Sequence, residues 1–150
     1  LVSLVRREAK ALAHQRESDW LICDGSPGIG CPVIASITGA DQVLIVTEPT
    51  RSGLHDLMRV EELCRRFDVD AGVCINKADL HPSMSCKIEA AAQARGLRIF
   101  GSVRYDDAVT TAQLQRKAVV ECSNGPAATD IRRLWNQLMK GEDDESRTRV

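Results

Sequence analysis

The sequence predicts an α/β domain with a mostly parallel sheet flanked by helices. Apolar segments with strand character alternate along the chain with segments whose apolar residues recur at helical spacing. Three polar clusters each follow a predicted strand, at the sheet edge where ligands of open α/β sheets bind. The chain has 150 residues, 43 % of them hydrophobic, which suits one domain with its own core.

Strands are predicted at residues 19–24, 42–47, 71–75 and 98–103, and helices at residues 1–16, 33–38, 52–67, 87–94, 107–115 and 127–139. Residues 19–24 (DWLICD) have the continuous apolar run of a buried strand. Ser52 is expected to cap its helix, and Gly96 to follow the end of another. The last helix has a clear apolar stripe, formed by Ile131, Leu134, Trp135, Leu138 and Met139. Residues 1–140 are thus predicted to form the domain, and residues 141–150 a disordered charged tail.

Composition narrows the classes of partner. The formal net charge is −1, so no overall field favours nucleic acid or an anionic membrane, and we expect no nucleic-acid partner. No stretch approaches the ~20 apolar residues of a membrane span. The six cysteines form no CxxC pair, and two of them, Cys23 and Cys74, lie within predicted strands. This usage favours a reducing, cytoplasmic location over a disulfide scaffold.

The first candidate site is the loop DGSPGIGCP, residues 24–32. Asp24 ends a predicted strand, where a carboxylate can hold the Mg²⁺ of a nucleotide directly or through water. Gly28 allows its backbone N–H to approach a γ-phosphate. Two alternatives are a plain glycine-rich turn and a dinucleotide-binding loop. The dinucleotide loop is disfavoured because Asp24 would lie close to a pyrophosphate with no metal between them.

The second candidate is Asn76-Lys77-Ala78-Asp79, which follows the strand at residues 71–75. The Asn76 amide both donates and accepts hydrogen bonds, and the Asp79 carboxylate accepts them from base N–H groups. The aliphatic stem of Lys77 can lie along a base. This spacing is suited to the edge of a purine, and the alternative is a simple polar turn.

The third candidate is Tyr105-Asp106-Asp107, after the strand at residues 98–103. Tyr105 and Asp106 are expected to reach a nucleotide from this strand end. The alternative is an acidic helix start, which the helix dipole favours, and both roles are compatible.

Taken in order, these segments resemble the MinD/ParA superfamily of deviant P-loop ATPases. The stretches that carry the resemblance are DGSPGIGCPVIASITGADQVLIVTEPTRSGLHDLMRVEEL, VCINKADL and YDDAVTTAQLQRKAVVE, within about Asp19 to Met139. The match is closest to MinD-like ATPases with an inserted ferredoxin domain.

The resemblance implies binding of ATP and Mg²⁺ and gives roles to individual residues. Asp24 matches the Walker B aspartate, and Pro27 and Gly28 fall in the switch II loop, so Asp24 and Gly28 are the expected catalytic elements. Asn76 matches the asparagine that contacts adenine, and Asp79 fills the neighbouring position. Two residues depart from the family, since Ser26 and Arg104 each stand where it has proline.

The family also carries an amino-terminal Walker A loop with a signature lysine, followed by a two-cluster ferredoxin insertion. The 150 residues contain no GKGGxGK[ST] string. We therefore expect the carboxy-terminal part of such an ATPase, missing the P-loop strand and helix, inactive alone and partnered by the amino-terminal segment. The strands at residues 19–24 and 42–47 would lose their common neighbour, which predicts weak stability, a partner chain, or direct pairing of the two.

Cys31 lies seven residues after Asp24. In the nitrogenase iron protein, of the same superfamily, a cysteine at this spacing ligates a [4Fe–4S] cluster shared across a two-fold axis. The resemblance thus implies a possible cluster ligand, a homodimer and a redox partner. The alternative is a partly buried structural thiol.

Three functions fit these observations. The first is the carboxy-terminal half of an ATPase linked to iron–sulfur or electron-transfer chemistry. The second is a MinD/ParA-like positioning ATPase that acts as a nucleotide-gated dimeric scaffold. The third is an ATP-dependent amide-forming domain of the cobyrinate-synthase type.

Overall fold

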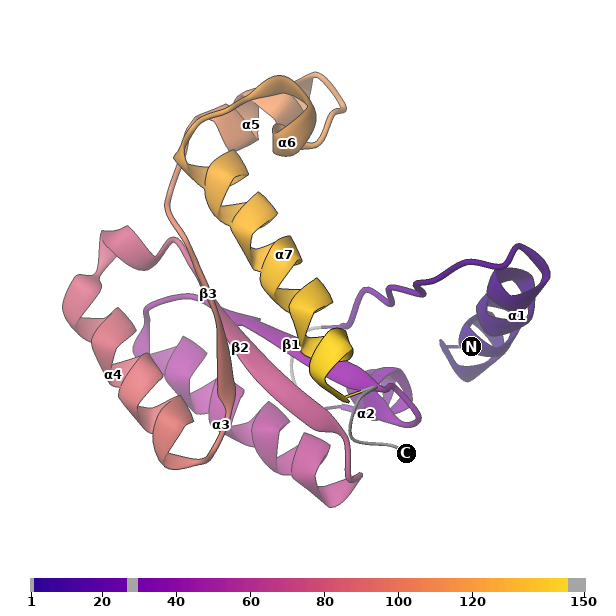
Figure 1. The fold of residues 1–150 in the computed structure, drawn as a ribbon. Helices are drawn as coiled ribbons and strands as arrows, with labels where there is room; N and C mark the ends of the chain where they lie inside the picture. The colour runs from indigo at the N-terminus through magenta and orange to yellow at the C-terminus, as the bar shows by residue number, and fades with distance from the viewer. Residues whose placement is uncertain (1, 27–29, 146–150) are drawn as a thin grey trace. The chain divides into compact units, whose positions relative to one another are not determined.

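The computed structural model of the protein describes residues 2–26 and 30–145 (Figure 1). The chain divides into two compact units. The first comprises Leu1–Val43 and Asp56–Ala71, and the second comprises Leu44–His55 and Gly72–Val150. The polar clusters predicted after the strands at residues 71–75 and 98–103 both fall in the second unit.

The sheet of the described residues has three strands, β1 (Gln42–Thr47), β2 (Asp70–Asn76) and β3 (Arg98–Val103), in the order β1-β2-β3. β2 and β3 are parallel, with Gly72 opposite Arg98 and a register irregularity at Val73/Cys74. Residues 71–75 of β2 are all buried, as expected for a central strand covered on both faces. The predicted parallel α/β sheet is therefore confirmed.

Seven α-helices and one 3₁₀ helix accompany these strands in the described residues. They are α1 (Val2–Gln15), α2 (Cys31–Ile37), α3 (Arg51–Arg66), η1 (Ala78–Leu80), α4 (Pro82–Ala94), α5 (Ala108–Leu114), α6 (Val119–Cys122) and α7 (Pro126–Glu145). α7 extends beyond residue 139, where the sequence predicts it to end. Residues 146–150 of the predicted tail lie outside the described residues.

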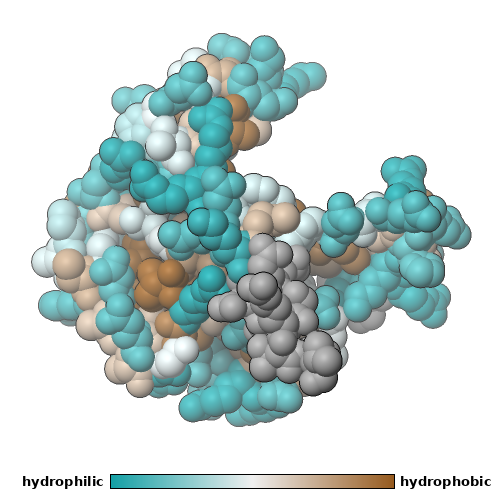
Figure 2. Space-filling model, in the orientation of Figure 1, coloured by the Kyte–Doolittle hydropathy of each residue, from teal (hydrophilic) through white to brown (hydrophobic). Residues whose placement is uncertain are grey.

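The core of the second unit forms where α7 meets the sheet. Both α4 and α7 pack against β3. Cys74 of β2, Val103 of β3 and Ala127 of α7 make one buried cluster, and Ile131 and Leu134 of α7 pack against it. A second cluster joins α5, α6 and α7 through Ala112, Val119 and Ala128. The predicted apolar stripe of the last helix thus contributes to this core. On the face shown in Figure 2, hydrophilic residues are interspersed with smaller hydrophobic patches.

Gly96 ends α4 as the sequence predicts. Its φ is +77°, and the paired bonds from Gly96 N to Gln93 O and from Leu97 N to Ala92 O, both 3.0 Å, close the helix. The start of α4 differs from the prediction of residue 87, because the helix already begins at Pro82. Proline suits a first helical turn, where its missing N–H has no helical partner to lose.

Two other local predictions are wrong. Residues 19–24 form no strand in the described structure, and Ile22 is 72 % exposed. An apolar run becomes a strand only when its backbone groups pair with a neighbouring strand, and the described sheet is made by other segments. Ser52 is not the cap of α3: Thr50 Oγ1 accepts the Gly53 N–H at 2.9 Å, and α3 begins at Arg51.

Candidate functional site

The loop after β2 makes a tight left-handed turn. Asn76 Oδ1 accepts the backbone N–H of Lys77 at 3.0 Å, and Lys77 has φ +53° and ψ +39°. A non-glycine residue adopts this conformation at a cost, and an adjacent asparagine that hydrogen-bonds the backbone compensates for it. Within the described residues the Asn76 amide nitrogen has no hydrogen-bond partner, so it remains a donor for a ligand.

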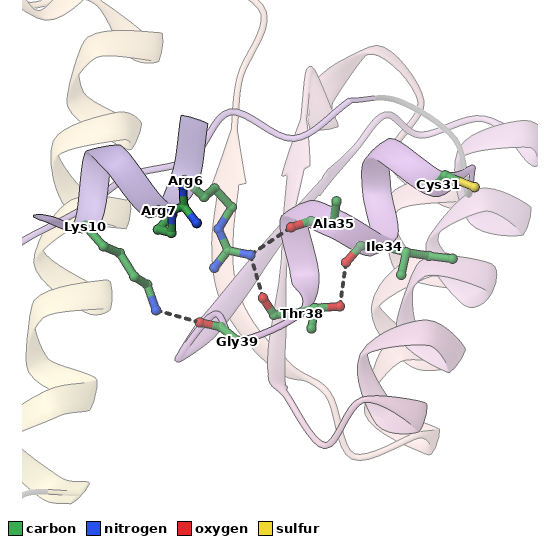
Figure 3. A pocket seen from close by; sticks show the side chains of 8 residues that line it. All are labelled: Arg6, Arg7, Lys10, Cys31, Ile34, Ala35, Thr38 and Gly39. Carbon is green, nitrogen blue, oxygen red and sulfur yellow. Dashed lines mark hydrogen bonds between the residues drawn. The ribbon is translucent and has the colours of Figure 1, made fainter. Parts of the chain in front are cut away.

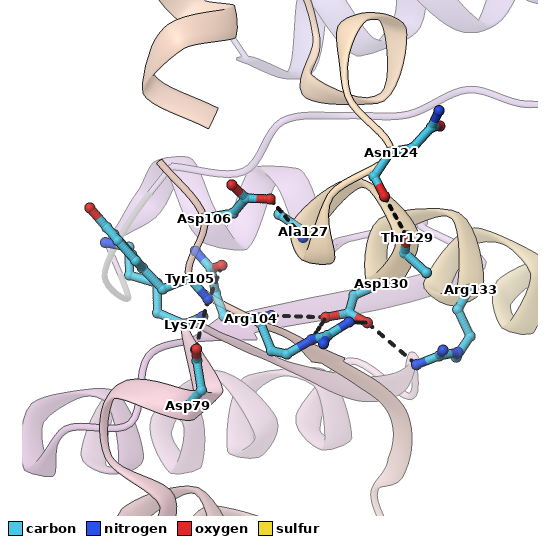
Figure 4. Close-up of polar contacts among 11 residues, drawn as sticks. Lys77, Asp79, Arg104, Tyr105, Asp106, Asn124, Ala127, Thr129, Asp130 and Arg133 are labelled. Carbon is cyan, nitrogen blue, oxygen red and sulfur yellow. Dashed lines mark hydrogen bonds and ion pairs between the residues drawn. The ribbon is translucent and has the colours of Figure 1, made fainter. Parts of the chain in front are cut away.

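Lys77 is held by the loop that follows β1. Its Nζ lies 2.7 Å from Glu48 Oε1, in a pair that is about half exposed. The hydrogen bond to Glu48 raises the pKa of Lys77, so the ammonium stays charged. In the view of Figure 4 the Lys77 and Tyr105 side chains lie on the same side of the loops. No motif in the sequence indicates this role of Glu48.

The loop after β3 is joined to the loop after β2 through Asp79. Asp79 Oδ1 accepts the backbone N–H of Tyr105 at 2.7 Å. Among the described residues, Asp79 Oδ2 has no hydrogen-bond partner. The Tyr105 hydroxyl donates to Asp107 Oδ1 at 2.8 Å, and this bond raises the pKa of Tyr105. The predicted base-side residues therefore form one connected group at the carboxyl ends of β2 and β3.

Asp106 caps two helices at once. Its Oδ1 accepts the N–H of Ala108, at the start of α5, at 2.9 Å, and its Oδ2 accepts the N–H of Ala127, in the first turn of α7, at 3.2 Å (Figure 4). A carboxylate at a helix start is favoured by both the free N–H groups and the helix dipole. Asp106 therefore has the role at a helix start that the sequence left open as an alternative. Its contact with a nucleotide stays a prediction.

Arg104 and Asp130 form a bidentate ion pair between a half-exposed guanidinium and a buried carboxylate. Arg104 Nε donates to Asp130 Oδ2 at 2.7 Å and Nη2 donates to Oδ1 at 3.0 Å, while the Arg104 backbone N–H adds a bond of 3.1 Å to Oδ2. Asp130 is only 3 % exposed. These bonds to Arg104 hold the pKa of Asp130 below its usual range. The one sequence feature that could have indicated this ion pair is the acidic residue at position 130, which lies four residues before Leu134 of the apolar stripe.

The predicted metal ligand, Asp24, lies in the other unit. Asp24 is exposed and lies outside regular secondary structure, and its carboxylate has no hydrogen-bond partner among the described residues. Its role as a ligand of Mg²⁺ stays a prediction. Pro27 and Gly28 lie outside the described residues. Those residues contain no group of three or more His, Cys, Asp or Glu side chains placed to hold a metal ion.

An open cavity of about 550 Å³ lies in the first unit, between α1 and α2 (Figure 3). Arg6 Nη1 donates to the carbonyl oxygens of Ala35 at 2.8 Å and Thr38 at 2.6 Å, and Lys10 Nζ donates to Gly39 O at 3.1 Å. Arg6 and Lys10 thus bind the free carbonyl groups at the carboxyl end of α2 and offset the negative end of its helix dipole. Both cations are therefore accounted for by contacts within the fold. Cys31 lines the cavity at the other end of α2, and it is exposed.

The comparisons with known proteins agree with this architecture. No protein-family model matches the chain. Similar proteins from Methanocaldococcus jannaschii include the following two. The uncharacterized protein MJ0578 is 29 % identical over 126 residues, which cover 84 % of this chain and 42 % of that protein. The uncharacterized ATP-binding protein MJ0823 is 28 % identical over 138 residues, which cover 91 % of this chain and 52 % of that protein. The chain thus spans about half the length of these relatives.

Solved structures define the class of fold. The MinD cell division protein of Aquifex aeolicus matches with a TM-score of 0.73 and 21 % identity, over 88 % of this chain and 59 % of that one. The cell division ATPase MinD of Pyrococcus furiosus matches with a TM-score of 0.76 and 18 % identity, over 93 % and 57 %. The chain therefore has an α/β fold of the P-loop NTPase type. More particularly, it is the fold of the MinD ATPases, which confirms the predicted fold class.

No helix among the described residues is both long enough and apolar enough to cross a membrane.

Proposed function

We propose that this chain is the carboxy-terminal part of a MinD-like ATPase and supplies the base-binding side of its nucleotide site. One observation carries the proposal: the ends of three strands are joined in one place by the Lys77–Glu48 ion pair and the Tyr105–Asp79 hydrogen bond. Ligands of open parallel sheets bind at this edge. The ATP-binding relative and the MinD-like fold support the same class of ligand.

The free hydrogen-bonding groups of the site suit a purine. The Asn76 amide nitrogen can donate to a ring nitrogen, and Asp79 Oδ2 can accept from an exocyclic amine. The aliphatic stem of Lys77, anchored at its end by Glu48, provides an apolar surface for the base. Tyr105 and Asp106 border the site from the loop after β3.

The phosphate side of the site requires two further elements in this proposal. Asp24 holds Mg²⁺, and the Pro27–Gly28 segment acts as a switch that changes conformation when the γ-phosphate leaves. The β- and γ-phosphates bind to a Walker A loop in an amino-terminal segment of the same protein. Matches that cover about half of each relative support a longer parent protein. The 150-residue chain is then expected to bind nucleotide weakly and to hydrolyse none.

Nucleotide binding tests the base site. Calorimetry with ATP and GTP on the 150-residue chain is expected to show binding to ATP that Asn76→Ala weakens about tenfold, a loss of one good hydrogen bond. Asp41→Asn, an exposed change at the amino end of β1, is the matched control and should have no effect. Equal ATP affinity in Asn76→Ala would overturn the base site, and a preference for GTP would overturn the assignment to ATP.

Phosphate release tests the division of the active site. The purified chain is expected to release no phosphate from ATP in the presence of Mg²⁺. Turnover that Asp24→Asn abolishes would show that the 150-residue chain already completes a catalytic site, against the proposal.

Cys31 supports an extension of this function toward iron–sulfur chemistry. Its thiol is exposed at the start of α2, where a ligand must be accessible. Two copies of the chain would bring two such thiols, so a [4Fe–4S] cluster needs a homodimer and further ligands. Anaerobic reconstitution followed by absorption spectroscopy tests this. A cluster that Cys31→Ser removes supports the extension, and a spectrum unchanged by Cys31→Ser excludes it.

The structural likeness to MinD supports a second candidate, a nucleotide-gated positioning ATPase. One of the similar structures is a MinC:MinD complex of Aquifex aeolicus, with a TM-score of 0.78 and 19 % identity over 93 % of this chain and 60 % of that one. In this case ATP should drive dimer formation without any cluster. Sedimentation analysis with and without ATP distinguishes this candidate, because its dimer is independent of Cys31.

A further inference from the structure

Asp130 combines deep burial with an unusually complete set of bonds to one neighbour. It accepts three hydrogen bonds from Arg104, two from the guanidinium and one from the backbone N–H. A fourth contact, from Arg133 Nη1 at 3.4 Å, reaches Asp130 Oδ1 from the same helix. A buried carboxylate is stable only when its oxygens are matched in this way.

These bonds fix a backbone position as well as a charge. Arg104 immediately precedes Tyr105, whose N–H is the donor to Asp79 Oδ1. The hydrogen bond from the Arg104 N–H to Asp130 therefore fixes the backbone at the residue that precedes Tyr105. On the other side of Tyr105, Asp106 is bound to the Ala127 N–H of α7 (Figure 4). The segment that reaches Asp79 is thus attached to α7 both before and after Tyr105.

We propose that Asp130 is a positioning residue for the purine site: from α7 it holds Arg104, and so aims the Tyr105 N–H that orients the Asp79 carboxylate. This inference rests on the proposed function, because it gives Asp79 a role in base recognition. A residue that orients a ligand-binding side chain can affect the selectivity of the site without touching the ligand.

The opposing interpretation is that the pair only stabilises the fold. The two differ in what Asp130→Asn does locally. The asparagine keeps the size of the side chain but loses the charge and one of the acceptors on which the guanidinium fork depends. A purely structural pair would lower the protection of all core amides together. A positioning residue loosens Tyr105 first.

Amide hydrogen exchange on the 150-residue chain separates these cases. In Asp130→Asn we expect the Tyr105 amide to exchange at least tenfold faster, while the Leu97 amide, bonded to Ala92 O at the end of α4, changes less than twofold. Arg133→Lys is the matched control, since Arg133 is largely exposed and makes only the long contact to Asp130 within the part of the chain that the structure describes, and it should leave both amides unchanged. Should Asp130→Asn fail to fold, Arg104→Lys keeps the charge and the backbone donor but removes the fork. It should act in the same direction.

Base selectivity provides the second readout. Adenosine carries the exocyclic amine from which Asp79 would accept a hydrogen bond, and purine riboside lacks this amine. We expect the wild-type chain to prefer adenosine by about tenfold, and Asp130→Asn to reduce this ratio toward one. Unchanged Tyr105 exchange together with an unchanged ratio in folded Asp130→Asn would overturn the positioning role. Absence of adenosine binding in the wild type would instead refute the base site itself, while the exchange data would still show whether Asp130 holds Tyr105.

Discussion

Tyr105 donates its backbone N–H to Asp79 Oδ1 over 2.7 Å, across 26 positions of sequence. This bond to a charged acceptor is stronger than one between neutral groups, and it connects the loops that follow β2 and β3. It also leaves the second carboxylate oxygen of Asp79 without a protein partner among the described residues. The Asp79 side chain is therefore oriented by the fold and still available to a ligand.

Asp79→Asn tests that availability. The amide can still accept the Tyr105 N–H, but it presents a donor where the carboxylate presented an acceptor. We expect ATP binding to weaken at least tenfold, while the free energy of unfolding falls by only about 1 kcal/mol, because the bond from Tyr105 is kept but its acceptor loses its charge. Calorimetry and urea unfolding measure the two effects. Wild-type affinity in the variant would mean that Asp79 does not touch the base.

The Arg104–Asp130 pair predicts a pH dependence of stability. Hydrogen bonds to Arg104 lower the pKa of Asp130 in the folded state relative to the unfolded value of about 3.9. The stabilisation is therefore complete above pH ~4 and is lost as the pH falls through the lowered folded pKa. Urea unfolding of the wild type and Asp130→Asn should show a difference in free energy that is constant near neutrality and shrinks below pH ~4. A difference that does not change down to the acid limit would contradict this assignment.

Gly72 is predicted to be irreplaceable for steric reasons. A Cβ built on it would lie 2.1 Å from Cε2 of Phe100, whose side chain is fully buried. Gly72→Ala should therefore lower the free energy of unfolding by about 1–3 kcal/mol, the usual cost of overpacking. Gly25→Ala is the control, because nothing lies within 4 Å of the added atom. Phe100→Leu in the Gly72→Ala background should recover part of the loss, and equal stability of the two alanine variants would show that the ring moves freely.

Cysteine reactivity should divide the six thiols into two classes. Cys23, Cys31, Cys86 and Cys122 are exposed, whereas Cys64 and Cys74 are buried. Burial raises the pKa of both Cys64 and Cys74 to about 11, so almost none of the reactive thiolate forms at pH 8. A thiol reagent should label four cysteines of the native chain and the remaining two only in denaturant. Rapid labelling of Cys74 in the native state would show that the core around β2 opens.

The sequence predicts most of this fold because its strands carry strong local signals. The bounds of β1 and β3 coincide with the predicted ones, since each is a short apolar run closed by polar residues. The segment at residues 19–24 has the same local signal and forms no strand, because strand formation also depends on neighbours that a local pattern does not contain. The start of α4 was missed for the opposite reason, as residues 82–86 have little apolar periodicity.

The candidate site was predictable in its residue types and not in its connections. Asn76, Lys77 and Asp79 stand out by spacing alone. The ties that place them involve Glu48 and Tyr105, and Asp130 supports the Tyr105 segment. These contacts join residues 26 or more positions apart, as in the Arg104–Asp130 pair. Such pairs depend on how the strands are ordered in the sheet, and no local pattern encodes that order.

The central claim is that the loops after β2 and β3 bind a purine base. Titration of the ¹⁵N-labelled 150-residue chain with adenosine, followed by amide chemical shifts, tests it most directly. We predict saturable shifts at Asn76, Lys77, Asp79 and Tyr105, with the amides of α1 and α2 unaffected. Shifts confined to the cavity between α1 and α2, or none at millimolar adenosine, would contradict the claim.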